Sequence, residues 1–516
     1  RSSAASDVYK RQLLDMNIMG TRLFVKTLFG LCICCLLFGC KDDTKDLVTE
    51  NERKTTDEQY YANRFASEAL GIYYYWNEEI AADLKKLDPE TNTDPISTVN
   101  EIRYHQGETY IDKWTALIDD MSSVESSLQG VTTSYGYELL FYVNESGTAI
   151  YGVVAFVYAD SPAEKAGLKR GDVIYALNGV TLNQNNYMDL YYTSQENLSV
   201  ANFILTDDGY ALDQSSSRDI TLQAVEMYEN PILCHKVLDV NGRKVAYLAY
   251  SSFDLNSVGP LIEICKEFKA EGVKDLILDL RYNGGGYVIT ESVIASMLAP
   301  QDVVSAGKVL ETEEYNDILT EEYRKQGYTD FNTYFQTEYD YPSESFYANT
   351  KDANIGLEHI YALIGPNSAS ASEALLGGLM PYMPVTLIGE QSHGKYCTGL
   401  MLEVSNFYYN VPEAIKNWGL YVMISIYKNS AGETPCMPDG LIPDIVAYDN
   451  PLMTEQLGDE NEVMLKTALQ VIGKVYPETG SRAVSVPMLK AIPSHHKANF
   501  GKRIMLKEQL DALTSN

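Results

Sequence analysis

The chain has 516 residues, of which 45% are hydrophobic and 22% charged, a composition typical of a folded protein of roughly two to four domains. It holds 40 Lys and Arg residues against 71 Asp and Glu residues, so its formal net charge is −31. An acidic surface of this kind repels phosphate groups, which argues against a nucleic-acid-binding function.

The first forty residues predict export rather than a folded segment. Residues 1–12 (RSSAASDVYKRQ) match nothing that follows and are interpreted as a cloning or sequence-assembly scar. Residues 19–40 place two basic residues before a short apolar run that closes as Leu37-Phe38-Gly39-Cys40, which is typical of a signal peptide. The closing motif resembles a bacterial lipobox and implies a lipid on Cys40. We therefore expect a lipoprotein anchored to the outer membrane, on its periplasmic or its outer side.

A tether and a small helical domain are expected next. Residues 41–56 are polar and charged, as in a flexible tether. Residues 57–132 show apolar side chains at helical spacings, including a repeat from Trp114 to Met121, and predict a helical N-terminal domain.

Residues 133–228 change to short β-type runs separated by tight turns. Within them, residues 161–174 (SPAEKAGLKRGDVI) resemble the signature of the PDZ domains attached to bacterial proteases. The resemblance implies a β-rich domain that takes up a peptide C-terminus as an added strand. It places the peptide carboxylate near Tyr135, Gly136 and Tyr137. The alternative is a spacer domain that only packs on its neighbour.

Residues 235–475 alternate predicted strands and helices, which indicates an α/β layer fold. The clearest strands are expected at 244–250, 276–280 and 360–364. Residues 476–516 carry six basic and three acidic residues and are interpreted as a solvated tail, with docking on the acidic body as the alternative. The four cysteines beyond the leader form no CxxC pair, so no metal site is expected.

Two motifs in the α/β region could carry chemistry. The first, at 279–286 (DLRYNGGG), follows a buried strand, and its glycines leave backbone N–H groups open to an anion, either a phosphate or an oxyanion. It lacks the Gly-Lys-Ser/Thr of a nucleotide-binding loop. The second, at 366–376 (PNSASASEALL), follows a strand and opens a helix, where a serine between small residues could be a nucleophile. From composition alone, an ordinary Ser/Ala-rich helix cap is the alternative.

A nucleophilic serine needs a base, and two residues compete for that role. Lys395 could serve if burial kept its amine neutral. His393, two residues earlier, has the more convenient intrinsic pKa. Cys397 invites a thiol-protease interpretation, but no motif supports it.

The loop at 279–286, the SASASE segment and Gly394-Lys395 occur in this order behind a PDZ-like region. Together they are similar to the C-terminal processing (tail-specific) serine peptidase family, in its Bacteroidetes-type lipoprotein branch. The resemblance implies a multidomain α+β chain with a small helical domain, a PDZ domain and a crotonase-like α/β peptidase core. It also implies peptide or protein substrates, a Ser–Lys dyad, and neither a cofactor nor a metal.

Carried over position by position, the resemblance makes Ser370 the nucleophile and Lys395 the general base. The backbone N–H groups of Ala371 and of Gly285 or Gly286 would form the oxyanion hole. Arg281 and Asn283 would shape the glycine loop; they come from the same motif and are not expected to react.

One departure from the family pattern stands out. The longer family motif has a Gln four residues after the lysine that orients it, and here Gly399 occupies that position. Either the dyad suffices or another polar group, with Thr398 as a candidate, orients Lys395. A catalytically silent PDZ-bearing peptide-binding lipoprotein and a Ser–His esterase are the alternatives to a peptidase.

Overall fold

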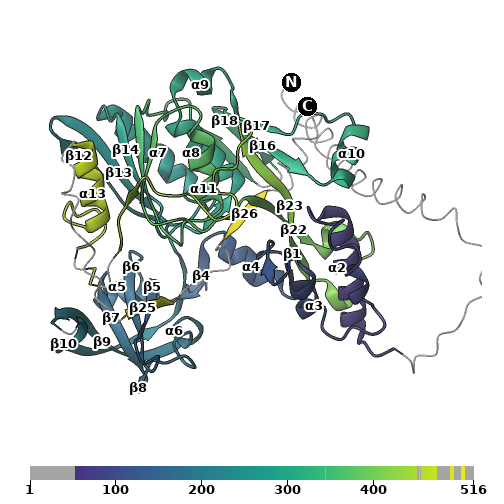
Figure 1. The fold of residues 1–516 in the computed structure, drawn as a ribbon, viewed down its shortest axis with the longest axis horizontal. Helices are drawn as coiled ribbons and strands as arrows, with labels where there is room; N and C mark the ends of the chain where they lie inside the picture. The colour runs from purple at the N-terminus through teal and green to yellow at the C-terminus, as the bar shows by residue number, and fades with distance from the viewer. Residues whose placement is uncertain are drawn as a thin grey trace, which may run out of the picture.

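The computed structural model describes residues 53–207, 209–342, 345–449, 452–453, 455–473, 489–492 and 501–505. The predicted leader with its lipobox Cys40, and the tether up to residue 52, lie outside these ranges. Figure 1 shows an α/β core with the PDZ domain beneath it and the N-terminal helices at its side. Within the described residues, no helix is long and apolar enough to span a bilayer.

The N-terminal domain is built around one long helix. Thr56 caps it, because its Oγ1 accepts the N–H of Gln59 (3.2 Å) while the Gln59 side chain accepts the N–H of Thr56 (2.9 Å). The elements are α2 (Asp57–Tyr73), η2 (Leu84–Lys86), α3 (Pro95–Ile102), β1 (His105–Gln106), β2 (Thr109–Tyr110), β3 (Ala116–Ile118) and α4 (Met121–Leu128).

The helical repeat predicted from Trp114 to Met121 is wrong. Ala116–Ile118 is the strand β3, which pairs antiparallel with a long strand of the core, and a helix begins only at Met121. Tertiary strand pairing overrides a helical apolar spacing in so short a segment.

The PDZ domain is a β-sheet with two short helices. Ser161 caps the first helix by accepting the N–H of Glu164 (3.1 Å). The elements are β4 (Val131–Ser134), β5 (Tyr137–Asn144), β6 (Ile150–Val157), α5 (Pro162–Lys165), β7 (Asp172–Leu177), β8 (Val180–Thr181), α6 (Asp189–Tyr192), β9 (Gln195–Thr206), β10 (Gly209–Gln223) and β11 (Val225–Tyr228). The strand order is β10-β9-β7-β6-β5, followed by a strand from the C-terminal region, β25 (Leu489–Ile492).

The α/β core has two sheets. The first has the strand order β12-β13-β14-β20-β21-β24, in which all pairs except β12 with β13 are parallel. Its buried strands pack against α7, α8 and α11 on one face and against α13 on the other. The elements are β12 (Ile232–Val240), β13 (Arg243–Tyr250), α7 (Val258–Ala270), β14 (Asp275–Asp279), α8 (Val288–Leu298), β20 (His359–Ile364), α11 (Ala371–Leu379), β21 (Val385–Gly389), β24 (Ile445–Val446) and α13 (Val463–Ile472). The predicted mixed α/β fold is confirmed.

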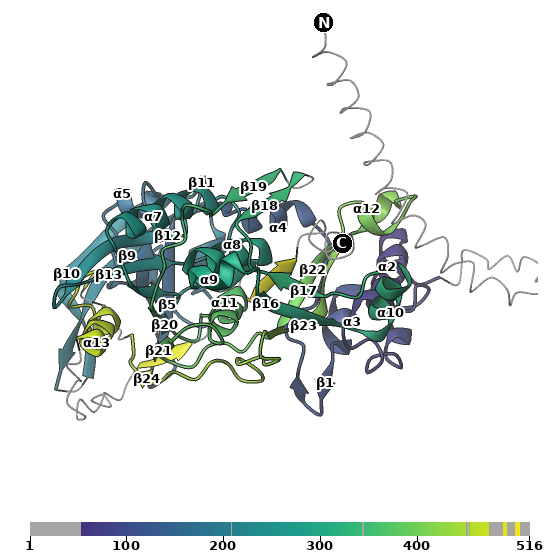
Figure 2. The same ribbon diagram turned by 90° about the horizontal axis from the view of Figure 1, so that it is seen from above.

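The second sheet has the order β15-β26-β22-β23-β16-β17, with β3 on β23. Its strands are β15 (Gly285–Tyr287), β16 (Val309–Tyr315), β17 (Asn332–Tyr334), β22 (Cys397–Glu403), β23 (Gly419–Asn429) and β26 (Lys502–Met505). The remaining elements are α9 (Gln301–Ser305), α10 (Asp317–Lys325), β18 (Glu338–Tyr341), β19 (Phe346–Asn349), α12 (Val404–Phe407) and η4 (Glu413–Ile415). Seen from above, β26 lies between α11 and β22, near the middle of the molecule (Figure 2).

The interpretation of residues 476–516 as a solvated tail is therefore wrong for its two described segments. Leu489–Ile492 extends the PDZ sheet and Lys502–Met505 is an inner strand of the second core sheet. Arg503 supplies the physical reason, because its fully buried guanidinium pairs with buried carboxylates. A basic segment in an acidic chain thus finds its counter-charges inside the fold.

Candidate active site

The two chemical motifs meet at the carboxyl edge of the first sheet. The glycine loop follows β14 and the SASASE segment follows β20, its parallel neighbour. Asn283 joins them, since its backbone oxygen accepts the N–H of Ala369 (3.0 Å) and the hydroxyl of Ser372 (3.0 Å).

Ser370 stands at the start of α11 with a φ of 64°, a left-handed conformation that non-glycine residues rarely adopt. Its side chain is buried, and its Oγ makes no hydrogen bond within the described part of the chain. A strained backbone and an unpaired buried hydroxyl are features of functional residues. This hydroxyl is therefore available for chemistry.

Glu373 ties Ser370 to Lys395. One oxygen of its buried carboxylate accepts both the N–H of Ser370 (2.7 Å) and the N–H of Lys395 (2.9 Å). The other accepts the N–H of Gly394 (2.6 Å) and the hydroxyl of Ser392. Burial raises the pKa of Glu373 to about 7, against the opposing effect of these hydrogen bonds. The sequence analysis missed this residue, whose only signal is its place in SASASE.

Lys395 is fully buried, as a lysine base requires. Burial lowers its pKa to about 8, so a large fraction of the amine is neutral in mildly alkaline solution. Its Nζ lies 5.4 Å from the ring centre of Trp114 and 5.2 Å from that of Tyr421. In this conformation Nζ donates to Tyr421 Oη (2.9 Å) and not to Ser370 Oγ.

The hypothesis that Thr398 orients Lys395 is wrong. The hydroxyl of Thr398 donates to Glu313 (2.9 Å) and accepts from Arg503, and it makes no hydrogen bond to the amine. The orienting contact comes from Tyr421 on β23, which the sequence analysis did not identify. Gly399 is the sequence signal that could have indicated this contact, because a Cβ at position 399 would lie 2.3 Å from the Tyr421 ring.

The glycine loop lies directly against Ser370. A Cβ at Gly285 would come within 2.8 Å of the Ser370 Cβ, and the φ of Gly285 is 107°. The Gly285 N–H donates to Asn283 Oδ1 (2.9 Å), and Asn283 Nδ2 donates to the Tyr250 oxygen (3.0 Å). The N–H of Gly285, one of the predicted oxyanion donors, is thus already hydrogen-bonded within the loop.

Gly286 and Ala371 are the remaining predicted donors. Gly286 has a φ of 147° and lies opposite Arg503 in the β15–β26 ladder. Ala371 is the first residue of α11, where a backbone N–H has no partner within the helix. The oxyanion hole stays a prediction for these two groups.

Arg281 acts on the other side of the loop. Its guanidinium binds Asp279 (2.9 and 2.7 Å) and Glu462 (2.7 and 2.9 Å) and also reaches Asp449 (3.2 Å). Arg170, from the PDZ signature, joins the same group through Asp449 (2.6 Å). The loop is thus held by a buried ion network shared with the PDZ domain.

The rival base His393 and the rival nucleophile Cys397 make other contacts. The N–H of His393 donates to the Ser368 oxygen (2.9 Å), and its imidazole packs edge-on against Trp114 with ring centres 6.3 Å apart. Burial raises the pKa of Cys397 to about 12, which opposes formation of a thiolate.

The predicted carboxylate loop of the PDZ domain is engaged internally. Tyr135 and Tyr137 are buried, and their hydroxyls donate to the backbone oxygens of Thr193 (2.8 Å) and Leu190 (2.5 Å). The N–H of Gly136 donates to the hydroxyl of Ser134 (3.1 Å).

β26 lies between the loop strand β15 and the strand β22 that follows Lys395. Its Arg503 is fully buried and pairs with Glu291 (2.9 Å), Glu313 (2.7 Å) and Glu311. The backbone oxygen of Arg503 accepts the Tyr421 hydroxyl (3.3 Å). The strand β26 therefore contacts both the glycine loop and Tyr421, the hydrogen-bond partner of Lys395.

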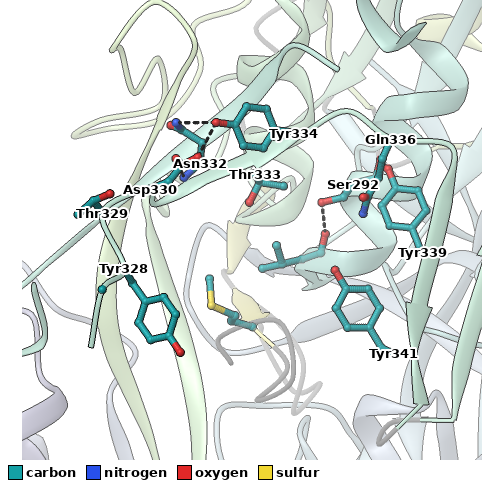
Figure 3. A pocket seen from close by; sticks show the side chains of 13 residues that line it. Ser292, Tyr328, Thr329, Asp330, Asn332, Thr333, Tyr334, Gln336, Tyr339 and Tyr341 are labelled. Carbon is teal, nitrogen blue, oxygen red and sulfur yellow. Dashed lines mark hydrogen bonds between the residues drawn. The ribbon is translucent and has the colours of Figure 1, made fainter. Parts of the chain in front are cut away.

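A cavity of about 260 Å³ opens beside this strand (Figure 3). Its wall includes Val288 and Ser292 of α8, which directly follows the glycine loop, and Met505 of β26. The opposite wall is rich in tyrosine and comes from the segment 327–341.

Comparisons with known proteins agree with this geometry. Residues 244–447 match peptidase family S41 and residues 153–190 match the PDZ domain. The carboxyl-terminal-processing protease of Picosynechococcus sp. is 22% identical over 454 residues, covering 86% of this chain and 95% of that protein. The protein of the same name from Synechocystis sp. is 25% identical over 347 residues, covering 66% and 68%.

The fold has a solved counterpart. A putative S41 protease from Bacteroides fragilis superposes with a TM-score of 0.60 at 20% identity, covering 80% of this chain and 98% of that one. Sequence and fold thus agree at the level of domains: residues 244–447 are similar to peptidase family S41, and residues 153–190 are similar to the PDZ domain.

Proposed function

We propose that this peptidase is a carboxyl-terminal processing endopeptidase that uses Ser370 as nucleophile and Lys395 as general base. One observation carries the proposal: a single oxygen of Glu373 accepts the backbone N–H groups of both residues. This contact holds together two segments that lie twenty-five positions apart in the sequence. The relatives named above, which are carboxyl-terminal-processing proteases, support the reaction class.

Each step of acyl transfer is assigned to a residue of this site. Neutral Lys395 leaves Tyr421, takes the proton from Ser370 Oγ, and the oxygen attacks the scissile carbonyl. The N–H groups of Ala371 and Gly286 stabilise the oxyanion. Lys395 then gives its proton to the leaving amine, and an acyl-enzyme on Ser370 remains. Water, deprotonated by the same amine, releases the acyl group.

Substrate recognition would involve two further places. The PDZ domain would take up the end of a protein chain as an added strand along β5. The tyrosine-rich cavity next to α8 offers room for substrate side chains close to the glycine loop.

We also propose that the protein is anchored to the outer membrane through a lipid on Cys40. The support is the leader pattern and the closing lipobox-like motif in the sequence. Labelling of growing cells with a radioactive or clickable fatty acid tests it. Label on the parent and none on Cys40→Ser is expected, and equal labelling of both would refute the anchor.

The enzymatic proposal is tested by digesting an unfolded protein mixture with the soluble form that begins at Lys41. The cut sites are identified by mass spectrometry, and the variants Ser370→Ala and Lys395→Ala run in parallel. We expect cleavage by the parent and loss of all cut sites in both variants. Cleavage that survives in Lys395→Ala but disappears in His393→Ala would transfer the base role to the histidine. Peptide binding without any cleavage by the parent would identify a silent binding protein instead.

A further inference from the structure

One edge of the PDZ sheet, the strand β5, is covered by a segment of the same chain. β25 pairs antiparallel with β5, so that Ile492 lies opposite Phe141 and Leu489 opposite Asn144. β5 begins at Tyr137, the last residue of the predicted carboxylate loop. β25 therefore runs toward that loop, which is the direction in which an extended peptide adds to a PDZ sheet. Figure 1 shows β25 beside β5 at the underside of the molecule.

The side chains of β25 lie against the domain as those of a bound peptide would. Leu489 and Ile492 are half-buried, whereas Lys490 and Ala491 are exposed. Ile492 packs against the apolar cluster of the domain that contains Phe141 and Leu190. Backbone pairing with an apolar anchor side chain is how strand addition gains both affinity and specificity.

The inner end of the same groove is closed by α6. Tyr191 Oη accepts the N–H of Leu139 (3.0 Å), a backbone donor of β5. The Tyr137 hydroxyl donates to the Leu190 oxygen, and Gly136 gives its N–H to Ser134. Groups that would bind the end of a peptide are thus satisfied within the domain.

We propose that Leu489–Ile492 is an intramolecular ligand of the PDZ groove that competes with extended peptides ending in an apolar residue. This rests on the proposed function only in assuming that the groove binds peptides. The segment is also tethered beyond the groove: Gly501 donates its N–H to the Gly284 oxygen (2.8 Å), and β26 begins at the next residue.

The tether makes the competition strong. A short linker holds a ligand at about millimolar effective concentration. Such a competitor weakens an outside ligand about tenfold when its own dissociation constant is about 0.1 mM, and more when it binds tighter. The apparent affinity of the groove for an outside peptide therefore depends on the fraction of molecules in which Leu489–Ile492 is unbound.

The test measures binding of a fluorescein-labelled peptide, Gly-Ser-Leu-Lys-Ala-Ile with a free carboxylate, by fluorescence anisotropy. All proteins carry Ser370→Ala, so that the probe is not cut. Ile492→Asp places a charge in the apolar groove, and the matched control Ala491→Asp places the same charge at an exposed position of the same strand. We expect at least tenfold tighter binding by Ile492→Asp and an unchanged affinity for Ala491→Asp.

A second measurement needs no substitution in β25. Hydrogen exchange of the protein with intact β25 is compared without and with a large excess of the unlabelled peptide. The amides of 489–492 should exchange faster with peptide present, while those of β5 remain protected. Equal affinities in the three proteins, no binding in any of them, or no change in exchange would each overturn the proposal.

Cleavage of casein by the same proteins with Ser370 restored separates the test of the peptidase function from the test of the intramolecular ligand. Cleavage that persists while the peptide never binds would leave the peptidase function standing and refute only the intramolecular ligand. Peptide competition without any cleavage would do the reverse.

Discussion

The ring of Tyr421 fills the space that a Cβ at Gly399 would need, with the ring atoms only 2.3–2.5 Å from that position. Gly399 stands at the position where the family resemblance implies a Gln that orients the lysine, and Tyr421 Oη accepts the hydrogen bond of Lys395 Nζ (2.9 Å). The hydrogen-bond partner of the lysine thus comes from the neighbouring strand β23 and not from β22. The loss of the Gln does not leave the lysine without a partner.

Replacing Tyr421 by Phe tests this role. Tyr421→Phe keeps the ring and removes the oxygen that accepts the hydrogen bond of the Lys395 amine. We expect kcat to fall about ten- to a hundredfold with little change in KM, because a single hydrogen bond to a charged group contributes about 1.5–3 kcal/mol. The acid limb of the pH profile should also move to lower pH, since the charged amine loses its acceptor. An unchanged profile would show that Tyr421 only packs.

A swap variant provides the control for that experiment. Gly399→Gln alone should be inactive, because its side chain collides with the Tyr421 ring. The double variant Gly399→Gln with Tyr421→Ala opens the space and should regain part of kcat over Tyr421→Ala. No gain in kcat would show that the two positions are not interchangeable.

Activity should rise with pH through the pKa of Lys395. Burial lowers that pKa to about 8, and only the neutral amine can take the proton from Ser370. We expect kcat/KM on a peptide substrate to increase about tenfold per pH unit below pH 8 and to level off above pH 9. The measurement is a pH series from 6 to 10. A limb near pH 6.5 that is lost in His393→Ala would contradict the lysine.

The same burial costs stability. The pKa of Lys395 falls from 10.5 to about 8, so the folded state binds fewer protons than the unfolded chain between these values. The penalty is about 3 kcal/mol below pH 8 and fades as the pH approaches 10.5. Lys395→Met should therefore unfold at higher urea concentration than the parent at pH 7, with a smaller difference at pH 10. An equal difference at both pH values would show that the charge is not the cause.

The Arg503 cluster is expected to be essential for the C-terminal strand. Arg503→Met leaves three buried glutamates without their counter-charge, and removing one partner of a buried ion pair costs about 3–5 kcal/mol. Burial already raises the pKa of Glu311 to about 7. Adding Glu311→Gln should restore part of the lost stability in urea unfolding. Lys490→Met, on the exposed face of β25, is the matched control and should have no effect.

Removing the carboxylate of Glu373 should uncouple the dyad. Glu373→Gln replaces one acceptor oxygen by an NH₂ group, which only donates. Whichever way the amide is turned, either the pair of Ser370 and Lys395 or the pair of Gly394 and Ser392 loses its acceptor. We expect kcat to fall at least a hundredfold while the peptide affinity measured in the Ser370→Ala background stays the same. Full activity would show that the backbone alone positions the two residues.

Much of the site was predictable because its signals are local. The glycine loop and SASASE each follow a buried strand, and parallel neighbours place their carboxyl ends at one edge. The PDZ domain was predicted from one run of fourteen residues, in which Ser161 caps a helix and Gly167 ends the turn with a φ of 79°. Caps, turns and buried runs depend on residues a few positions apart, so the sequence determined them.

Other features depend on partners far along the chain. The acceptor for Lys395 comes from twenty-six positions later, and the carboxylates that hold Arg503 lie 190 to 212 positions earlier. A pairing strand, a counter-ion and a ring that fills the space above a glycine have no local pattern, because their energies arise only after the chain has folded. The sequence therefore sufficed to single out Ser370 and Lys395, and to place the PDZ-like region before the peptidase-like region. Only the tertiary structure decided what orients the lysine, and that a presumed tail completes both the active-site sheet and the PDZ sheet.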